Sequence, residues 1–315
     1  MWAYIVRRVV AFIPTMFFVV TVVFFLTHLV PGDPAAVFVG HQLATEEKLA
    51  EIRKELGLDK PILVQYTSWL SRVVKGDFGT SIFLNRSVSE VVFETLPVTI
   101  NLSILSMALT LIVSIPMGII AAMKRNTSAD AGIILFSVAG ISLPHFWLGF
   151  LFILLFAVTL NWLPTSGYRP LSMGFVLWIR HMILPVLSLS LGLIALMTRM
   201  TRTSMLEILG KEYIMTARAK GLGRWQVIYK HALRNAMIQI ITVAGLSFAI
   251  ILGGSIIIET VFALPGVGRL IVTAAVRRDY PVIQGAVFYL TGITLFVNLI
   301  VDVSYSLINP KITYE

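Results

Sequence analysis

Long stretches without a charged residue constrain this chain more than any other feature. Residues 9–30, 95–123 and 131–168 contain no Asp, Glu, Lys or Arg. A helix needs about 20 apolar residues to cross the hydrocarbon core of a bilayer. Only 13% of the chain is charged, against about 25% in soluble domains, and the mean hydropathy is +0.88. The sequence therefore predicts an all-α polytopic membrane protein.

The apolar runs predict six transmembrane helices. We place them at residues 9–30, 95–123, 131–162, 181–198, 236–258 and 281–306. The first run is too long for a typical signal-peptide core, and Pro31-Gly-Asp-Pro34 offers no small-residue cleavage site, so we expect it to be retained. Six spans place both termini on the same side of the membrane.

Basic residues set the expected orientation. Cytoplasmic loops are enriched in Lys and Arg. If both termini lie in the cytoplasm, most of the basic residues next to the spans also lie there: Arg7, Arg8, Lys124, Arg125, the loop at 199–235 and Lys311. Arg269, Arg277 and Arg278 conflict, because they fall in a short external loop. The opposite orientation would export the far more basic loop at 199–235, so we expect both termini in the cytoplasm.

Four regions follow from this topology. They are an N-terminal tail with the first helix (1–30), an extracytoplasmic helical region (31–94), a core of five helices (95–306) and a cytoplasmic tail (307–315). Within 31–94, we expect one helix capped by Thr45 and ended by Gly57. A second helix is expected to begin with Pro61 in its first turn and to carry an apolar side of Leu63, Tyr66, Leu70 and Val73.

The polar interruption at 199–235 is the segment best suited to work in the cytoplasm. It carries only two acidic residues, Glu207 and Glu212, against eight basic ones: Arg199, Arg202, Lys211, Arg218, Lys220, Arg224, Lys230 and Arg234. Its centre, residues 212–221, predicts a short helix that stops at Gly221, which suits the left-handed position after a helix end. A second helix is expected from Arg224 into the fifth span.

The sequence offers no internal source of energy for transport. An ion-coupled carrier usually keeps carboxylates or histidines inside its spans, yet Asp302 is the one carboxylate clearly within a span, and His28 and His145 are isolated. The sequence has no Gly-x-x-x-x-Gly-Lys-Ser/Thr phosphate loop and no cysteine. It also lacks a catalytic or metal-binding pattern, so we expect neither an enzyme nor a bound cofactor. The net charge of +9 is explained by the flanks of the spans and by membrane lipid rather than by nucleic acid.

Two polar stripes could line a substrate pathway. Hydroxyl residues recur on one face of the second span: Thr99, Ser103, Ser106, Thr110 and Ser114. The sixth span carries a second stripe: Thr291, Thr294, Asn298, Asp302 and Tyr305. Of these, Ser103, Ser106, Thr110, Ser114, Thr294, Asn298 and Asp302 are the candidate pathway residues. Close packing by small hydroxyl residues is the alternative for the first stripe, and a polar contact between helices is the alternative for the second.

Residues 212–236 resemble the EAA loop of type I ABC transporter permeases, the helix that docks in a groove of the ATPase subunit. The match is closest to the oligopeptide, dipeptide and nickel permease family, through Ala217-Arg-Ala-Lys-Gly-Leu222 and His231-Ala-Leu-Arg-Asn-Ala236. The general pattern has a glutamate at Met215, alanine at Thr216 and proline at Arg234. Further matching pieces occur in order along nearly the whole chain, at 31–34, 56–66, 76–79, 141–144, 163–168, 253–259, 265–269, 278–281 and 309–310.

The resemblance implies the type I ABC importer permease fold and a defined set of partners. These are a homologous second permease, two ABC ATPase subunits that hold ATP and Mg²⁺, and an extracytoplasmic substrate-binding protein. The implied place is a bacterial or archaeal cytoplasmic (inner) membrane. The ATPase-coupling residues carried over are Glu212, Thr216, Ala217, Arg218, Ala219, Lys220, Gly221, Leu222, His231 and Asn235.

The expected function is import of di- or oligopeptides, with half of the pathway on this chain. Glutathione and a nickel complex are alternative cargoes of the same machinery. Two other classes stay open. One is an ATP-independent carrier or channel, and the other is a receptor subunit whose region 31–94 only captures a ligand.

Overall fold

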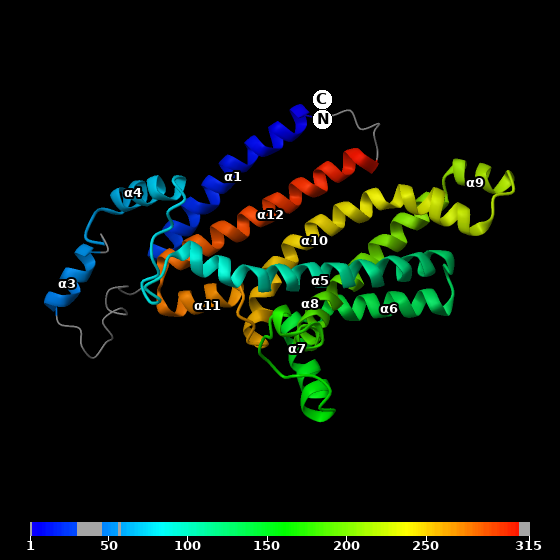
Figure 1. The fold of residues 1–315 in the computed structure, drawn as a ribbon. Helices are drawn as coiled ribbons and strands as arrows, with labels where there is room; N and C mark the ends of the chain where they lie inside the picture. Colours follow the sequence, from blue (N-terminus) through cyan, green and yellow to red (C-terminus); the bar gives the residue numbers. More distant parts are fainter. Residues whose placement is uncertain (1, 30–45, 56–57, 309–315) are drawn as a thin grey trace. The chain divides into compact units, whose positions relative to one another are not determined.

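The computed structural model describes residues 2–29, 46–55 and 58–308, and nearly all of these lie in helices (Figure 1). The first part holds α1 (Trp2–Leu29), α3 (Glu46–Glu55), α4 (Ile62–Val74) and α5 (Val88–Met123). The middle holds α6 (Ser128–Ser142), α7 (His145–Phe152), α8 (Phe175–Leu209) and α9 (Glu212–Ala219). The last part holds α10 (Arg234–Val261), α11 (Val267–Arg277) and α12 (Tyr280–Ile308). One π-helical turn, η1 (Ile153–Thr159), extends α7, and another, η3 (Gln226–Leu233), leads into α10.

The described residues contain five single helices long and apolar enough to cross a membrane. They lie in α1, α5, α8, η3 with α10, and α12, and a bent pair of helices makes six if it counts as one span. The predicted fold class, an all-α polytopic protein, is thereby confirmed. The prediction that 131–162 forms one continuous helix is wrong. The helix breaks at Leu143 and Pro144, because the ring of Pro144 disfavours a helical conformation at the residue before it. The axis bends by 100° between the two parts.

Two helix boundaries also differ from the sequence prediction. The fourth span continues as α8 to Leu209, so residues 199–209 are helical rather than loop. No proline or glycine interrupts them before Gly210, and Arg202 finds a buried partner. In α4, Pro61 precedes the first helical residue and does not lie in the first turn. The buried residues of α4 are Trp69 and Val73, whereas Leu63, which was predicted to face inward, is 66% exposed. The expected cap Thr45 and stop Gly57 lie outside the described residues.

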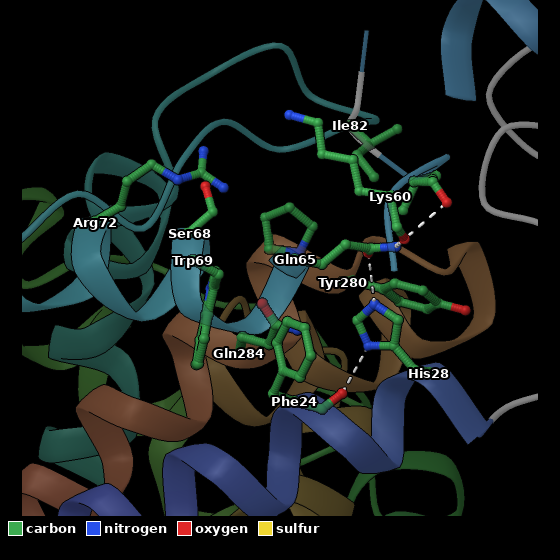
Figure 2. A pocket seen from close by; sticks show the side chains of 12 residues that line it. Phe24, His28, Lys60, Gln65, Ser68, Trp69, Arg72, Ile82, Tyr280 and Gln284 are labelled. Carbon is green, nitrogen blue, oxygen red and sulfur yellow. Dashed lines mark hydrogen bonds between the residues drawn. The ribbon is translucent and has the colours of Figure 1, made fainter. Parts of the chain in front are cut away.

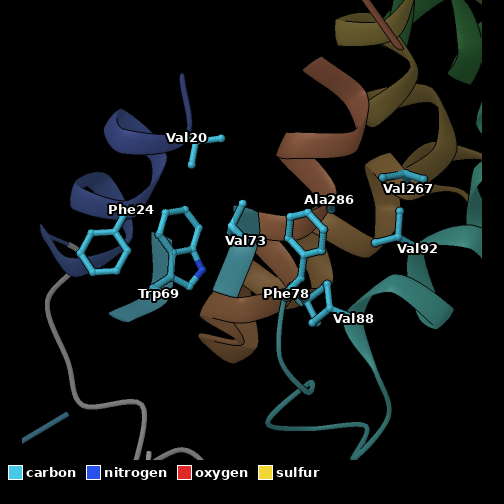
Figure 3. Packing of buried hydrophobic residues seen from close by; sticks show 11 residues of the cluster. Val20, Phe24, Trp69, Val73, Phe78, Val88, Val92, Val267 and Ala286 are labelled. Carbon is cyan, nitrogen blue, oxygen red and sulfur yellow. The ribbon is translucent and has the colours of Figure 1, made fainter. Parts of the chain in front are cut away.

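The chain divides into two compact units. One consists of the described residues within 9–99 and 265–293. Its core brings together side chains from α1, α4, α5, α11 and α12, among them Phe24, Trp69, Val88, Val267 and Ala286 (Figure 3). The fit is close, because a Cβ on Gly285 would lie 2.4 Å from Cγ1 of Val88. The helical segments from the two ends of this unit are therefore held by one shared apolar core.

A buried carboxylate also fixes this unit. Asp279, only 3% exposed, accepts hydrogen bonds from the Ser81 hydroxyl and from the backbone N–H groups of Ile82 and Phe83. A buried charge is costly unless it is satisfied in this way. Asp279 thus ties the turn before α5 to the start of α12.

The second unit consists of residues 100–264 and 294–308 of the described chain, with residues 2–8. A two-bond ion pair joins α6 to α8 in this unit: Arg202 donates from Nε to Oδ1 of Asp130 at 2.6 Å and from a terminal nitrogen to Oδ2 at 2.7 Å. The backbone N–H of Asn126 also donates to Asp130 at 3.0 Å. This contact explains how α8 keeps its polar end helical and fixed against α6.

Arg202→Gln tests this ion pair, because it leaves the buried Asp130 without a counter-charge. We expect the thermal unfolding midpoint of the purified chain to fall by about 5 °C or more. Arg86→Gln is the matched control, since Arg86 pairs with Glu90 and Glu94 on an exposed surface, and we expect a change of about 1 °C or less. Equal midpoints for the two variants would contradict the structural role of the Asp130–Arg202 pair.

Candidate functional site

The helix α9 stands where α8 ends and the chain turns back into η3 and α10 (Figure 1). Its C-terminal end is closed by two backbone hydrogen bonds, from Gly221 N–H to Arg218 O at 2.9 Å and from Leu222 N–H to Ala217 O at 3.3 Å. This pair of bonds is a Schellman motif. It requires a left-handed residue after the helix, and Gly221 has φ of +79°. The predicted stop at Gly221 is confirmed.

One face of α9 is seated in an apolar core. Ile214 is fully buried and Ala217 is 8% exposed. They pack in a cluster with residues from the end of α5, from α8 and from the return into α10: Ile119, Ala122, Met197, Met205, Val227, Ile228, Ala232, Ala236 and Ile240. Two inward residues three positions apart lie on one side of a helix. A force applied to α9 is therefore applied to the ends of several membrane-spanning helices.

The opposite face of α9 is exposed and combines apolar with charged groups. Tyr213 and Met215 are 43% and 57% exposed. Partial burial raises the pKa of Tyr213, against a smaller opposite effect of Lys211, so its hydroxyl stays neutral at physiological pH. Large exposed apolar side chains within a charged rim are typical of a protein interface.

The structure brings most of the predicted coupling residues to this exposed surface. Glu212, Thr216, Arg218, Ala219, Lys220, Gly221 and Leu222 are exposed, whereas Ala217 faces inward. Asn235 donates from its side-chain amide to His231 O at 2.7 Å. His231 is half-buried in η3, and Asn235 is exposed at the start of α10, so both belong to the return helix and not to α9.

Sequence reasoning missed one part of this surface. The rings of Trp225 and Tyr229 stack, with centroids 5.7 Å apart, and both side chains are more than half exposed. Their spacing of four residues would have predicted a common helix face. The stack extends the exposed apolar surface beyond α9.

The hydroxyl stripe of α5 is a packing face in the single chain. Ser103, Ser106, Thr110 and Ser114 are fully buried, and Ser190 of α8 donates to Ser106 O at 3.1 Å. The close approach continues at Gly118, where a Cβ would lie 2.5 Å from Cβ of Thr201. The residues Thr294, Asn298 and Asp302 of α12 are half-buried. Of the two interpretations left open for α5, close packing is the one this arrangement favours.

The two isolated histidines contact other parts of the fold. His28 joins α1 to α4, with Nδ1 2.8 Å from Phe24 O and Nε2 3.3 Å from Oε1 of Gln65, beside a pocket of about 140 Å³ (Figure 2). His145 lies where α6 and α7 meet, against two glycines. A Cβ on Gly192 would lie 3.0 Å from its ring, and one on Gly254 3.9 Å. Both positions agree with packed histidines.

Comparisons with known proteins agree along the whole chain. A family model described as "Binding-protein-dependent transport system inner membrane component" matches residues 114–314. The model for the N-terminal part of such membrane components matches residues 1–103. Together the two matches leave out only residues 104–113 and 315.

Relatives align end to end. A probable peptide ABC transporter permease protein of Sinorhizobium fredii is 43% identical over 314 residues, covering 100% of both chains. A glutathione transport system permease protein of Salmonella choleraesuis is 42% identical over 312 residues, covering 99% of each. The inward-facing MetNI methionine ABC transporter has a chain of similar fold, with a TM-score of 0.57, 16% identity, and coverage of 70% of this chain and 96% of that one.

Ile214→Ala tests whether α9 is seated by its inward face. Truncating a fully buried isoleucine costs about 2 kcal/mol or more, so backbone amides at 212–222 should exchange hydrogen at least about 30-fold faster. Met215→Ala is the matched control, because Met215 is exposed, and we expect a change of about twofold or less. Unchanged exchange in Ile214→Ala would show that the apolar core does not hold α9.

Proposed function

Because the chain belongs to the family of binding-protein-dependent transport system inner membrane components, we propose that it is the permease subunit of an ATP-driven peptide importer. Its α9 would receive a cytoplasmic ATPase subunit. One observation carries the coupling role, namely that α9 is exposed on one face and seated on the other in a core shared by α5, α8 and α10.

The seating of α9 suits it to transmit force. Converting a 1:99 mixture of two conformations into 99:1 requires about 5.5 kcal/mol of differential stabilisation. A loosely attached loop would absorb such a load by deforming, whereas α9 is closed by the Gly221 turn and held by Ile214. The exposed Tyr213 and Met215 would supply the apolar contact to the ATPase, and the nearby basic residues would supply the charged rim. ATP hydrolysis itself would take place on the partner chains.

A homologous second permease would complete the translocation pathway. Peptides carry charged ends and polar amides that hydrocarbon excludes, so the path needs polar lining. Thr294, Asn298 and Asp302 on the half-buried polar face of α12 are the candidates for that lining. The α5 hydroxyl residues, including Ser106 and Thr110, would reach the path only if α5 and α8 moved apart.

The proposed orientation places both termini and α9 in the cytoplasm, and the region 31–94 on the side of a substrate-binding protein. Basic flanks of the spans support this orientation. Two of the relatives are named as a probable peptide permease and a glutathione permease, and these cargoes share amide bonds and free carboxylates. We favour di- and oligopeptides as the cargo, with glutathione as the second candidate.

Gly221→Asp tests the coupling role of α9. The added charge projects from an exposed turn, where a Cβ on Gly221 would have no neighbouring atom within 4 Å. The left-handed φ of +79° also strains the turn once a side chain is added. The change should therefore alter both the docking surface and the closure of α9 while the chain still inserts. In proteoliposomes with the ATPase and binding-protein partners, we expect ATP-driven peptide uptake to fall about tenfold or more. Gly223→Asp is the control, because Gly223 is also open but has no left-handed backbone, and uptake should change less. Normal uptake with Gly221→Asp would contradict the proposal.

A second test concerns the source of energy. Uptake of radiolabelled dialanine into proteoliposomes should require the permease pair, the ATPase subunits, the binding protein and ATP together. An excess of unlabelled glutathione shows whether that cargo shares the path. Dialanine uptake by the purified chain without nucleotide would favour an ATP-independent carrier or channel.

A further inference from the structure

A groove of about 640 Å³ lies beside α9, with three arginines in its wall. Arg125 follows the end of α5, Arg218 belongs to the last turn of α9, and Arg224 precedes η3. The rest of the wall is apolar apart from Gly210: Ala122, Met123, Leu206, Leu209, Leu222, Val227 and Ile228. The groove is thus strongly basic on one part of its wall and hydrocarbon-like on the rest.

The arginines have few negative partners among the described residues. No carboxylate lines the groove, and the ion pairs of Arg86, Arg202 and Lys211 do not involve its three arginines. Asp130 acts on Arg125 electrostatically, but its two oxygens are already bonded to Arg202. The guanidinium groups therefore retain donors for an external acceptor.

Helix ends account for only part of this positive charge. The C-terminal end of a helix carries about half an elementary negative charge, and α5, α8 and α9 all end at the groove. Together they offset about one and a half of the three arginine charges. A surplus of about one and a half positive charges remains beside the apolar wall.

We propose that this groove binds an anionic phospholipid, with the phosphate on the arginines and the glycerol and upper acyl carbons on the apolar wall. Arginine suits this role because its planar fork matches phosphate oxygens. Basic pockets between helices at the cytoplasmic side of a membrane bind such headgroups. The expected level of the groove in the bilayer rests on the proposed function, because it assumes that α5 and α8 end at the cytoplasmic surface.

A lipid in this groove would affect the proposed coupling between the ATPase and the membrane helices, because it would contact α9. Arg218 and Leu222 belong to α9 and its closing turn, whereas Met123 and Arg125 belong to the end of α5. A bound headgroup would therefore link α9 to α5. The anionic lipid content of the membrane would then tune how firmly α9 is held.

The test uses the purified full-length chain, with lipid binding measured by native mass spectrometry. Phosphatidylglycerol and phosphatidylcholine of matched acyl chains are the probes. We expect phosphatidylglycerol to bind more tightly, and Arg125→Gln to weaken its binding about fivefold, as for one basic residue near a headgroup. Lys124→Gln removes the same charge one residue away from the groove wall and should weaken binding less than twofold. Arg224→Gln, with Lys220→Gln as its control, repeats the comparison if Arg125→Gln does not fold.

Several outcomes would overturn the proposal. Equal losses in Arg125→Gln and Lys124→Gln would show diffuse attraction rather than a groove, and equal binding of the two lipids would remove the role of charge. Displacement of the lipid by inorganic phosphate at equal concentration would indicate a site for free phosphate. Loss of the lipid from the wild-type assembly with its ATPase would assign the groove to that partner. None of these readouts depends on transport, so they fail or succeed separately from the coupling proposal.

Discussion

The burial of Ile214 and Ala217 is the interaction on which the proposed mechanism depends. A membrane helix satisfies its own backbone groups, so the parts of the chain free to meet a soluble partner are the segments between spans. Such segments are usually mobile and transmit little force. Here the segment after α8 is a closed helix, ended by Gly221 and packed on the ends of α5, α8 and α10. It adds a rigid extension to the membrane-spanning helices.

Arginines in the described chain have three distinct surroundings. Arg202 is mostly buried and bonded twice to Asp130, so its charge serves the fold. Arg277 lies over the ring of Phe83, with the guanidinium carbon 3.6 Å from the centroid, a cation–π contact that steadies an arginine without a carboxylate. That contact gives a structural use for one of the arginines that conflict with the charge rule for loops. Arg218 and Arg224, in contrast, lack such partners among the described residues and line an open groove.

Features that depend on local sequence could be predicted, and features that depend on distant partners could not. The short helix at 212–221 follows from its pattern and its terminal glycine, and the approximate positions of the spans follow from uncharged runs. The break at Pro144 was missed because hydropathy reports how apolar a stretch is and not where the helix axis changes direction. The apolar run continues without interruption past Pro144. The helical end of α8 was missed because Arg202 looks like a loop residue until Asp130, distant in the sequence, is known to pair with it. Periodicity placed the α5 hydroxyls on one face but could not show that α8 covers that face.

The most direct test of the account is site-specific cross-linking from α9. The chain has no cysteine, so Thr216→Cys introduces a single thiol on the exposed face of α9. In inner-membrane vesicles of the complete transporter, the account predicts a cross-link from this thiol to the ATPase subunit that weakens when nucleotide changes the ATPase conformation. If a membrane-impermeant maleimide labelled Thr216→Cys from the extracytoplasmic side of the membrane, and no cross-link to the ATPase formed, the account would be contradicted.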